Sequence, residues 1–210
     1  MNVVLAPDGQ QIAGAFDGEI LDALQPSDLD PLNEMIHSAS AIICDCGLPA
    51  DVLLQLRSML APESFFYCNP GSVALSPRIE PLLDRLDLIT CNHLEASALT
   101  GVKIDGPAKL ISAAMILVKS GVKRAVVTFG ARGLGYADET RSQYHPALAA
   151  DLIDATGAGD ALAAAMINAL LGNQSIQAAL KHGLAAAAIT CESDESVSPL
   201  MSVQAIEERI

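Results

Sequence analysis

The sequence lacks any uninterrupted apolar run long enough to cross a membrane, although 51% of its 210 residues are hydrophobic. Its start, Met1 to Leu5, has neither a basic segment nor a long apolar run, so nothing there resembles an export signal. Cysteine is sparse and irregular: the five cysteines form no Cys-x-x-Cys pair and no framework of even count. Such cysteines are typical of reduced, buried thiols. We therefore expect a soluble cytoplasmic protein without a membrane partner.

Basic residues are also scarce, because 12 Lys and Arg stand against 25 Asp and Glu and give a net charge of -13. An acidic surface argues against nucleic acid as a partner. The chain has no Gly-x-Gly-x-x-Gly motif after its first strand, which argues against a dinucleotide-binding oxidoreductase. A length of 210 residues suits one compact α/β domain with an ample core.

Helical and apolar stretches alternate along the chain. Short apolar runs bounded by turn signals predict buried strands at 41–45, 65–69, 88–91 and 125–129. Helices are predicted at 50–60, 75–84, 93–99, 107–119, 175–190 and 203–209. Repeated strand-helix-strand units predict an α/β fold of three layers, Rossmann-like, with a mostly parallel sheet and helices on both faces.

The first residues follow a different pattern. Stretches 3–6 and 12–16 flank the turn Pro7-Asp8-Gly9 and predict a short hairpin. A hairpin is only marginally stable alone, so it must pair with another element. We interpret residues 1–20 as a hairpin segment and 21–210 as the α/β domain.

Polar side chains follow the predicted strands. They are Asp45, Asn69, Asn92 with Glu95, and Thr128 with Gly130. Ligands of open α/β sheets bind beyond the carboxyl ends of the strands, so these residues are candidates for a site. Each is also a common turn or cap residue, and a structural role stays open for each one.

The segment Asp154-Ala155-Thr156-Gly157-Ala158-Gly159-Asp160 leads directly into an apolar helix over 161–171, ended by Gly172. A glycine turn that opens a helix presents backbone N–H groups at the positive end of the dipole, which binds anions such as phosphate. Asp160 is placed to take a proton from a group that attacks that phosphate. The alternative is a tight turn followed by an acidic residue that the dipole favours. Because the helix is apolar on every side, it is predicted to be buried.

Two shorter patterns accompany this segment. Asn92 and Glu95, three residues apart at a helix start, could hold a hydrated Mg²⁺ or form a capping box, and the two roles are compatible. The run from Thr128 to Gly133 has glycines at 130 and 133, so its backbone can approach a ligand closely, although such a run is usually just a turn. Arg132 within it is either a phosphate partner or a solvated loop residue.

Residues 154–161 resemble the C-terminal signature of the ribokinase-like sugar kinases, the phosphofructokinase-B type. The departures are Ala155, where the family usually has Thr or Ser, and Leu162, where it has an aromatic residue. The resemblance implies ATP-dependent phosphoryl transfer to a sugar or nucleoside hydroxyl, with Asp160 as catalytic base.

The resemblance also implies the other site residues. It makes Gly157, Ala158 and Gly159 the anion hole, Asn92 and Glu95 the Mg²⁺ residues, Thr128, Gly130, Gly133 and His182 the nucleotide-binding residues, and Asp154 and Thr156 the residues of a monovalent cation site for K⁺. His182 alone, on an Ala-rich helix, is more often a core or surface residue.

Within the family, residues 45–49, 69–73 and 92–101 are most similar to pseudouridine kinase and related nucleoside kinases. The family's N-terminal region, with its first strands and most sugar-binding residues, has no counterpart in this chain. We therefore expect an impaired kinase that forms a homo-oligomer through an uncovered sheet edge. The alternative is a non-catalytic, nucleotide-binding or oligomerising remnant, and the acceptor is not specified.

Overall fold

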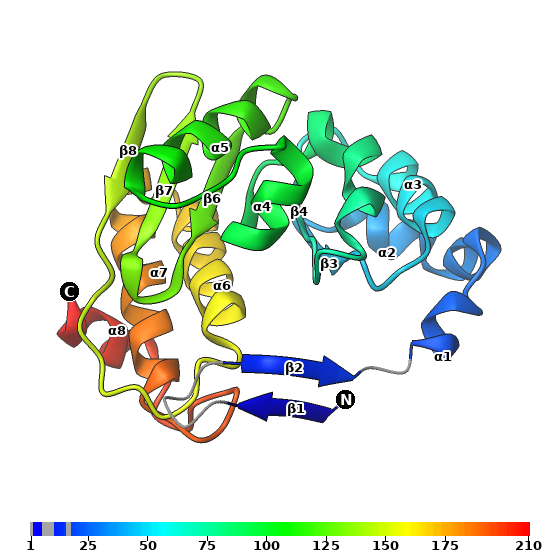
Figure 1. Cartoon of the computed structure of the whole chain (residues 1–210). Coiled ribbons are helices and arrows are strands. Elements are labelled where there is room, and N and C mark those ends of the chain that lie inside the picture. Colours follow the sequence, from blue (N-terminus) through cyan, green and yellow to red (C-terminus); the bar gives the residue numbers. More distant parts are fainter. Residues whose placement is uncertain (1, 6–10, 16–17) are drawn as a thin grey trace. The chain divides into compact units, whose positions relative to one another are not determined.

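The computed structural model describes residues 2–5, 11–15 and 18–210 of the chain (Figure 1). Contacts divide the chain into two compact units. The helical unit comprises Met1–Phe16 and Pro146–Ile210, and the sheet unit comprises Asp17–His145. Each unit is described by itself. The sequence-based domains, 1–20 and 21–210, stay a prediction.

The sheet unit contains six strands. They are β3 (Ala41–Asp45), β4 (Phe65–Asn69), β5 (Ile89–Asn92), β6 (Arg124–Thr128), β7 (Leu134–Asp138) and β8 (Ser142–His145). β3 pairs with β4 and β5 with β6, both in parallel, and a parallel bridge between Tyr67 and Leu88 continues the ladder between β4 and β5. β7 and β8 add two antiparallel strands. The mostly parallel α/β sheet is thus confirmed, with an antiparallel edge that was not predicted.

The helices of the sheet unit are α1 (Glu19–Asp22), η1 (Pro26–Leu32), α2 (Asn33–Ser38), α3 (Ala50–Met59), η2 (Ser76–Arg85), α4 (His93–Thr100), α5 (Pro107–Lys119) and η3 (Gly130–Arg132). The predicted helix at 107–119 is confirmed with the same bounds. The predicted α-helix at 75–84 is a 3₁₀ segment instead. Pro81 lies inside it, and proline has no N–H and clashes with the preceding turn of an α-helix.

Alternating strand residues build the core of the sheet unit. Phe66, Ile89 and Val127 pack with Leu53 of α3 and Leu117 of α5 in one buried cluster. Strand neighbours that point to opposite sides are buried as well, as Val126 and Val127 show at 0% exposure each. Both faces of the central strands are therefore covered.

The edge strand β3 differs from its prediction as a buried strand. Ile43 is 60% exposed, whereas its parallel partner on β4, Tyr67, is 3% exposed. The sequence is apolar from 41 to 44, but among the described strands β3 pairs only with β4. One side of the ribbon therefore stays open, which an apolar run alone does not reveal.

The helical unit contains α6 (Ala158–Leu171), α7 (Ile176–Cys191), α8 (Val203–Arg209) and the antiparallel pair β1 (Asn2–Leu5) and β2 (Gln11–Ala15). The predicted hairpin strands are confirmed, and the predicted turn Pro7-Asp8-Gly9 lies outside the described residues. α6 and α7 lie side by side (Figure 1). They approach closely at Gly183, where a Cβ would lie 2.7 Å from Cγ of Met166.

Helix α6 is not buried on every side, contrary to its prediction. Leu162, Met166 and Ile167 are buried, but Ala164, Asn168 and Leu171 are exposed. The exposed residues recur at helical spacing and so form one stripe. Because alanine and leucine occur on both sides of this helix, its composition hides the stripe.

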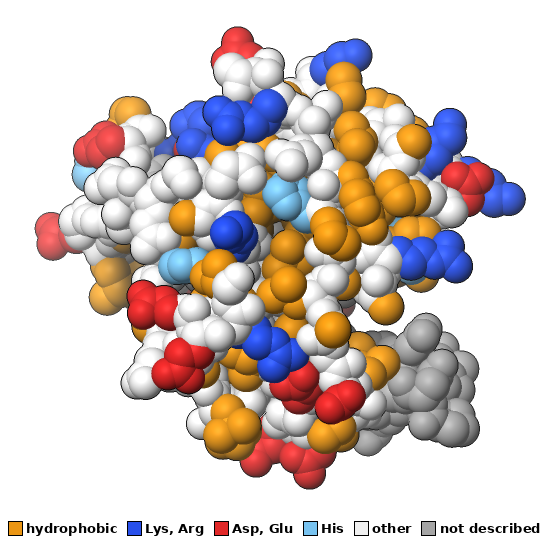
Figure 2. All heavy atoms as spheres, turned by 90° about the vertical axis from the view of Figure 1, so that its left-hand side faces the viewer, with side chains coloured by type: hydrophobic (Ala, Val, Ile, Leu, Met, Phe, Trp, Pro, Cys, Tyr) orange, Lys and Arg blue, Asp and Glu red, His pale blue; other side chains and the backbone are white. Residues whose placement is uncertain are grey.

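Searched over the described ranges, no helix combines the length and apolar character needed to span a bilayer. On the face drawn in Figure 2, Lys and Arg side chains lie in separate groups among acidic and apolar ones. The absence of a nucleic-acid partner stays a prediction.

Candidate active site

The entry to α6 requires glycine at position 157. Gly157 has a φ of 85°, in the left-handed region that other residues rarely adopt. A Cβ there would lie 2.1 Å from the carbonyl oxygen of Ser196, a backbone atom that cannot turn aside. The glycine therefore lets the turn pass against the loop that follows α7.

The N-terminus of α6 is open. No side chain caps it, and its first intrahelical bond runs from the N–H of Ala161 to the carbonyl of Gly157 at 2.9 Å. At Gly159 a Cβ would meet no described atom within 4 Å. Asp160 lies exposed in the first turn. The anion hole (Gly157, Ala158, Gly159) and Asp160 thus lie together at an accessible helix end, where backbone dipoles favour an anion.

Asp154 and Thr156 form a tight turn before the glycines. The carboxylate of Asp154 accepts a hydrogen bond of 2.7 Å from the N–H of Thr156. The N–H groups of Ile153 and Asp154 both donate to the carbonyl of Cys191, at 2.8 and 3.3 Å. Asp154 and Thr156 are half-buried. Carboxylate, hydroxyl and carbonyl oxygens are therefore concentrated here, as a hard cation requires.

His182 belongs to the same unit, on helix α7, and its side chain is half-buried. The predicted role of His182 in nucleotide binding is not tested by this placement and stays a prediction.

In the sheet unit, the polar residues at the strand ends share one edge. Asp45 is the register partner of Asn69, and Asn92 is the partner of Thr128. Each pair thus lies at the carboxyl ends of its own two parallel strands, and a shared site of the two pairs stays a prediction. Asp45 and Asn69 also close their own turns, since Asp45 accepts the N–H of Gly47 at 2.6 Å and Asn69 accepts that of Gly71 at 2.9 Å. At these two positions the turn role exists irrespective of any ligand.

Asn92 and Glu95 form a complete capping box on α4. The Asn92 amide oxygen accepts the N–H groups of Leu94 and Glu95 at 2.9 and 3.0 Å, and a Glu95 carboxylate oxygen accepts the Asn92 N–H at 2.9 Å. Both lone pairs of the Asn92 oxygen are therefore engaged. This donor set fits a hydrated Mg²⁺ contacted through water and does not fit a direct bond from Asn92. Within the described ranges, no group of three or more His, Cys, Asp or Glu could hold a metal ion, and the Mg²⁺ role stays a prediction.

Thr128 and the two glycines after it shape the loop between β6 and β7. Gly130 and Gly133 have φ values of 53° and 78°, so both adopt conformations that favour glycine. The N–H of Phe129 donates to Gly133 at 2.8 Å and closes the turn. A Cβ at Gly130 would meet no described atom within 4 Å, so backbone is accessible there.

A stack of His93, Phe129 and Arg132 stands beside this loop and was not predicted. The His93 and Phe129 rings are stacked with centroids 4.1 Å apart, and the Arg132 guanidinium carbon lies 4.7 Å from the Phe129 centroid. Burial, together with the positive charge of Arg132, lowers the pKa of His93 below its ordinary value. The sequence marks only the two positions, since His93 follows Asn92 and Phe129 follows Thr128, and it does not show that the rings meet.

The predicted site residues therefore form two groups. Asp154, Thr156, 157–160 and His182 belong to the helical unit, and Asn92, Glu95, Thr128, Gly130 and Gly133 belong to the sheet unit.

Comparison with known protein families matches the chain to the pfkB family carbohydrate kinases over residues 2–202. Among curated proteins, the chain is 33% identical over 111 residues to a ribokinase of Haemophilus influenzae, covering 53% of this chain and 36% of that protein. It is 24% identical over 187 residues to the pseudouridine kinase of Escherichia coli, covering 88% of this chain and 59% of that protein. The chain thus spans at most about three fifths of these two relatives.

Solved structures are similar over most of the chain. A carbohydrate kinase from Agrobacterium tumefaciens has 30% identity and a TM-score of 0.77, covering 99% of this chain and 66% of that one. Arabidopsis thaliana ribokinase, solved with ribose and ATP, has 21% identity and a TM-score of 0.75, covering 85% and 58%. Phosphofructokinase-2 from Escherichia coli, solved with potassium, has 23% identity and a TM-score of 0.74, covering 89% and 62%. The last two, at this identity, show the shared fold alone.

Proposed function

The chain belongs to the pfkB family of carbohydrate kinases, and from this membership we propose that it transfers a phosphoryl group from ATP to a hydroxyl of a sugar or nucleoside. Family relatives named ribokinase and pseudouridine kinase support this class of acceptor. The structure of a ribokinase with ribose and ATP supports ATP as the donor.

One observation carries the proposal: the open N-terminus of α6, with Asp160 exposed in its first turn. A transferring phosphoryl group gains negative charge on its equatorial oxygens. Backbone N–H groups fixed at a helix end stabilise that charge without having to reorganise. The sequence places a carboxylate at the same end, and no bulky side chain stands at Gly159.

The proposed roles follow from these positions. Asp160 takes the proton of the acceptor hydroxyl, which makes the oxygen a better nucleophile. The amides of Gly157 and Gly159 bind the transferring group, joined by the amide of Ala158, whose N–H now donates to the carbonyl of Ala155 at 3.2 Å. Asp154 and Thr156 hold a monovalent cation, for which the related phosphofructokinase-2 solved with potassium makes K⁺ the candidate. A cation there would add positive charge next to the anion hole.

The sheet unit supplies the remaining roles. Gly130 offers exposed backbone to the nucleotide, and Thr128 and Gly133 shape the loop that carries it. His182 of the helical unit is a further candidate for nucleotide binding. Asn92 and Glu95 hold hydrated Mg²⁺ through water, with the capping box intact. Bound Mg²⁺ would neutralise charge on the phosphates of ATP.

The test is ADP release by the purified chain with ATP, Mg²⁺ and KCl, with ribose, deoxyribose and pseudouridine as separate acceptors. Asp160→Asn should lower kcat about 10²- to 10⁴-fold and leave ATP affinity nearly unchanged, because only proton transfer is lost. The matched control is Asp51→Asn, which removes another exposed carboxylate from the first turn of a helix, α3.

Equal loss of activity in both variants, or none in Asp160→Asn, would contradict the role of Asp160. Calorimetric binding of a non-hydrolysable ATP analogue without turnover of any acceptor would instead support a non-catalytic nucleotide-binding protein.

A further inference from the structure

Residues 146–157, which lead to the open end of α6, contain no helix or strand. Such a segment keeps its position only through contacts with other elements. Among the described residues, its backbone is hydrogen-bonded to the C-terminal end of α7, to Glu192 just after it and to one side chain of α8, and Gly157 lies close to the loop after α7.

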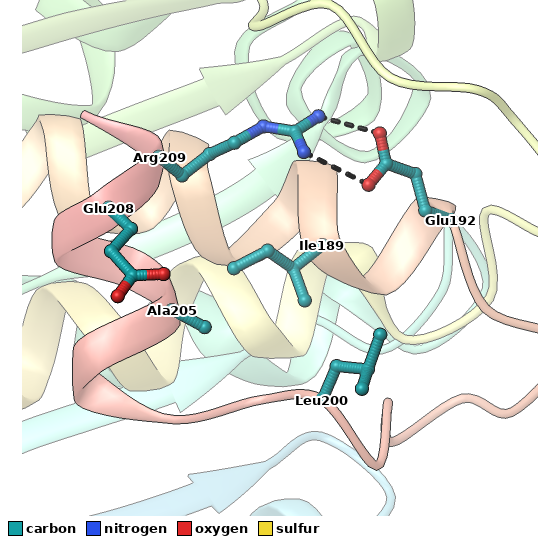
Figure 3. Close-up of a pocket in the computed structure, with 6 residues that line it drawn as sticks. All are labelled: Ile189, Glu192, Leu200, Ala205, Glu208 and Arg209. Atoms are coloured by element: carbon teal, nitrogen blue, oxygen red, sulfur yellow. Dashed lines mark hydrogen bonds and ion pairs between the residues drawn. The ribbon is translucent and has the colours of Figure 1, made fainter.

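The α8 contact is an ion pair with two hydrogen bonds. The Arg209 guanidinium donates through Nη1 to Oε2 of Glu192 at 3.0 Å and through Nη2 to Oε1 at 2.6 Å (Figure 3). This parallel geometry is the most specific that a guanidinium and a carboxylate adopt. Its hydrogen bonds from Arg209 hold the pKa of Glu192 below its ordinary value. The two side chains therefore fix the distance between α8 and the end of α7.

The same two side chains also hold the backbone of the segment. Nη2 of Arg209 donates to the carbonyl of Ala149 at 2.7 Å, and Oε1 of Glu192 accepts the N–H of Asp151 at 3.3 Å. Immediately afterwards, the N–H groups of Ile153 and Asp154 reach the carbonyl of Cys191, next to Glu192. The backbone is thus tied at four places between 149 and 154, and two of them depend on the ion pair.

The pair contributes little as a stabiliser. Its side chains are 32% and 31% exposed, and both of them line two hollows of about 310 and 270 Å³. In Figure 3, Ile189 and Leu200 line the larger hollow together with Glu192 and Arg209. Ion pairs with side chains this exposed stabilise a fold only weakly compared with buried packing. An effect on the position of the segment is therefore separable from an effect on global stability.

We propose that Arg209 and Glu192 are positioning residues that set the path of residues 149–154 and thereby the place of Asp154 and Thr156. The cation part of this inference rests on the proposed function, whereas the positioning part does not. The family match ends at residue 202, so Arg209 lies beyond the residues that it covers.

Hydrogen exchange of the full chain tests the positioning. In Arg209→Ala, amides of 151–157 should exchange about tenfold faster, because hydrogen bonds to charged groups are lost there. Arg209→Lys keeps the positive charge but cannot form the two parallel hydrogen bonds to Glu192. It should therefore give a smaller increase in the exchange rate. The control Arg57→Ala removes the Arg57–Asp84 pair of the sheet unit, whose arginine is also 32% exposed. Unchanged exchange at 151–157, or an equal rise throughout α6 and α7, would overturn the inference.

Potassium dependence tests the consequence for the site. Arg209→Ala should raise the half-saturating KCl concentration about tenfold, whether read from ADP release or from slowing of exchange at 153–157, while the KM for the acceptor stays constant. If the wild-type chain releases no ADP, the proposed function fails, and the exchange experiment still decides on positioning. A variant whose segment exchanges faster but whose KCl dependence is unchanged would overturn the link to Asp154 and Thr156.

Discussion

Candidate site residues lie at the N-termini of α4 and α6, and these two helix ends are capped in opposite ways. At α4, Asn92 and Glu95 satisfy each other's backbone N–H groups, so the helix end is closed by its own side chains. At α6, no side chain caps the helix, and Gly157 replaces the usual polar cap residue. The α4 end is therefore complete without a ligand, whereas the α6 end is suited to an anion from outside.

The comparison shows why the two ends respond differently to mutation. The closed end depends on side chains, so a side-chain deletion should cost stability. The open end depends on a backbone conformation at Gly157 that favours glycine. Adding a Cβ there should therefore lower the free energy of unfolding more than the side-chain deletion at α4 does. Three predictions, beyond the tests of Asp160 and Arg209, follow in order of expected effect.

Gly157→Ala should have the largest effect. Its Cβ would lie 2.1 Å from the Ser196 carbonyl oxygen, and a φ of 85° is itself unfavourable for alanine. We expect a loss of about 3 kcal/mol or more in the free energy of unfolding, with a fall of about 10 °C in Tm. Thermal unfolding followed by circular dichroism measures it.

The control is Gly159→Ala, two residues further on, where a Cβ would meet no described atom within 4 Å. Its Tm should change by less than about 2 °C, because an exposed helical position accepts alanine readily. The methyl group would nevertheless narrow the anion hole and weaken binding of an ATP analogue. Equal Tm values for the two variants would contradict the account of Gly157.

Asn92→Ala should have an intermediate effect. It leaves the N–H groups of Leu94 and Glu95 without the acceptor that they have now. The expected loss is about 1 kcal/mol, or about 3 °C in Tm. Asn92→Asp, which can accept the same bonds and adds a charge that the helix dipole favours, should recover the stability. If both variants melt at the same lowered temperature, the capping box does not stabilise α4.

Asp138 gives the smallest effect, in a turn that is also closed by its own side chains. Burial alone would raise its pKa, but hydrogen bonds from the Tyr136 hydroxyl, the Thr140 hydroxyl and the backbone N–H groups of Thr140 and Arg141 lower it to about 2. The folded pKa thus lies below the ordinary value of 3.8. The stability contributed by the ionised form is present above that value and is lost as the pH falls toward 2.

Unfolding free energies between pH 5 and pH 2.5 check this prediction. Asp138→Asn should be less stable than the wild type at pH 5 and should show a flatter decline toward acid. Glu139→Gln, at the exposed neighbouring position, is the control and should follow the wild-type curve. An unchanged slope in Asp138→Asn would show that this turn does not respond to pH as described.

Local patterns in the sequence predicted much of the fold. Strands 41–45 and 65–69 and helix 107–119 have the predicted bounds. Such bounds can be predicted because the spacing of apolar residues changes there and a Pro or Gly often marks the boundary, and both signals are local. The strands β7 and β8 escaped prediction. Gly135 and Ala137 have low strand propensity, and Gly135 is required by the close approach of α5, where a Cβ would lie 2.6 Å from the backbone of Leu110.

In the candidate site, too, local patterns predicted some features and missed those that depend on distant residues. The spacing Asn-x-x-Glu predicted both a capping box and a metal role, and the structure realises the box while the metal role stays a prediction. The His93–Phe129 stack joins residues 36 positions apart, so no local pattern contains it. Likewise, the contact of Arg209 with Ala149 depends on how α8 returns to the segment before α6.

The sequence by itself determined the alternation of strands and helices from β3 to β6, the glycine turn before α6, the position of Asp160 and the family to which the chain belongs. Each of these depends on residues that are neighbours along the chain. Only the tertiary structure decided that β3 is half exposed, that α6 has an exposed stripe and that Gly157 must pass Ser196. The physical reason is that burial and close backbone approach are set by distant segments, whose positions no local pattern encodes.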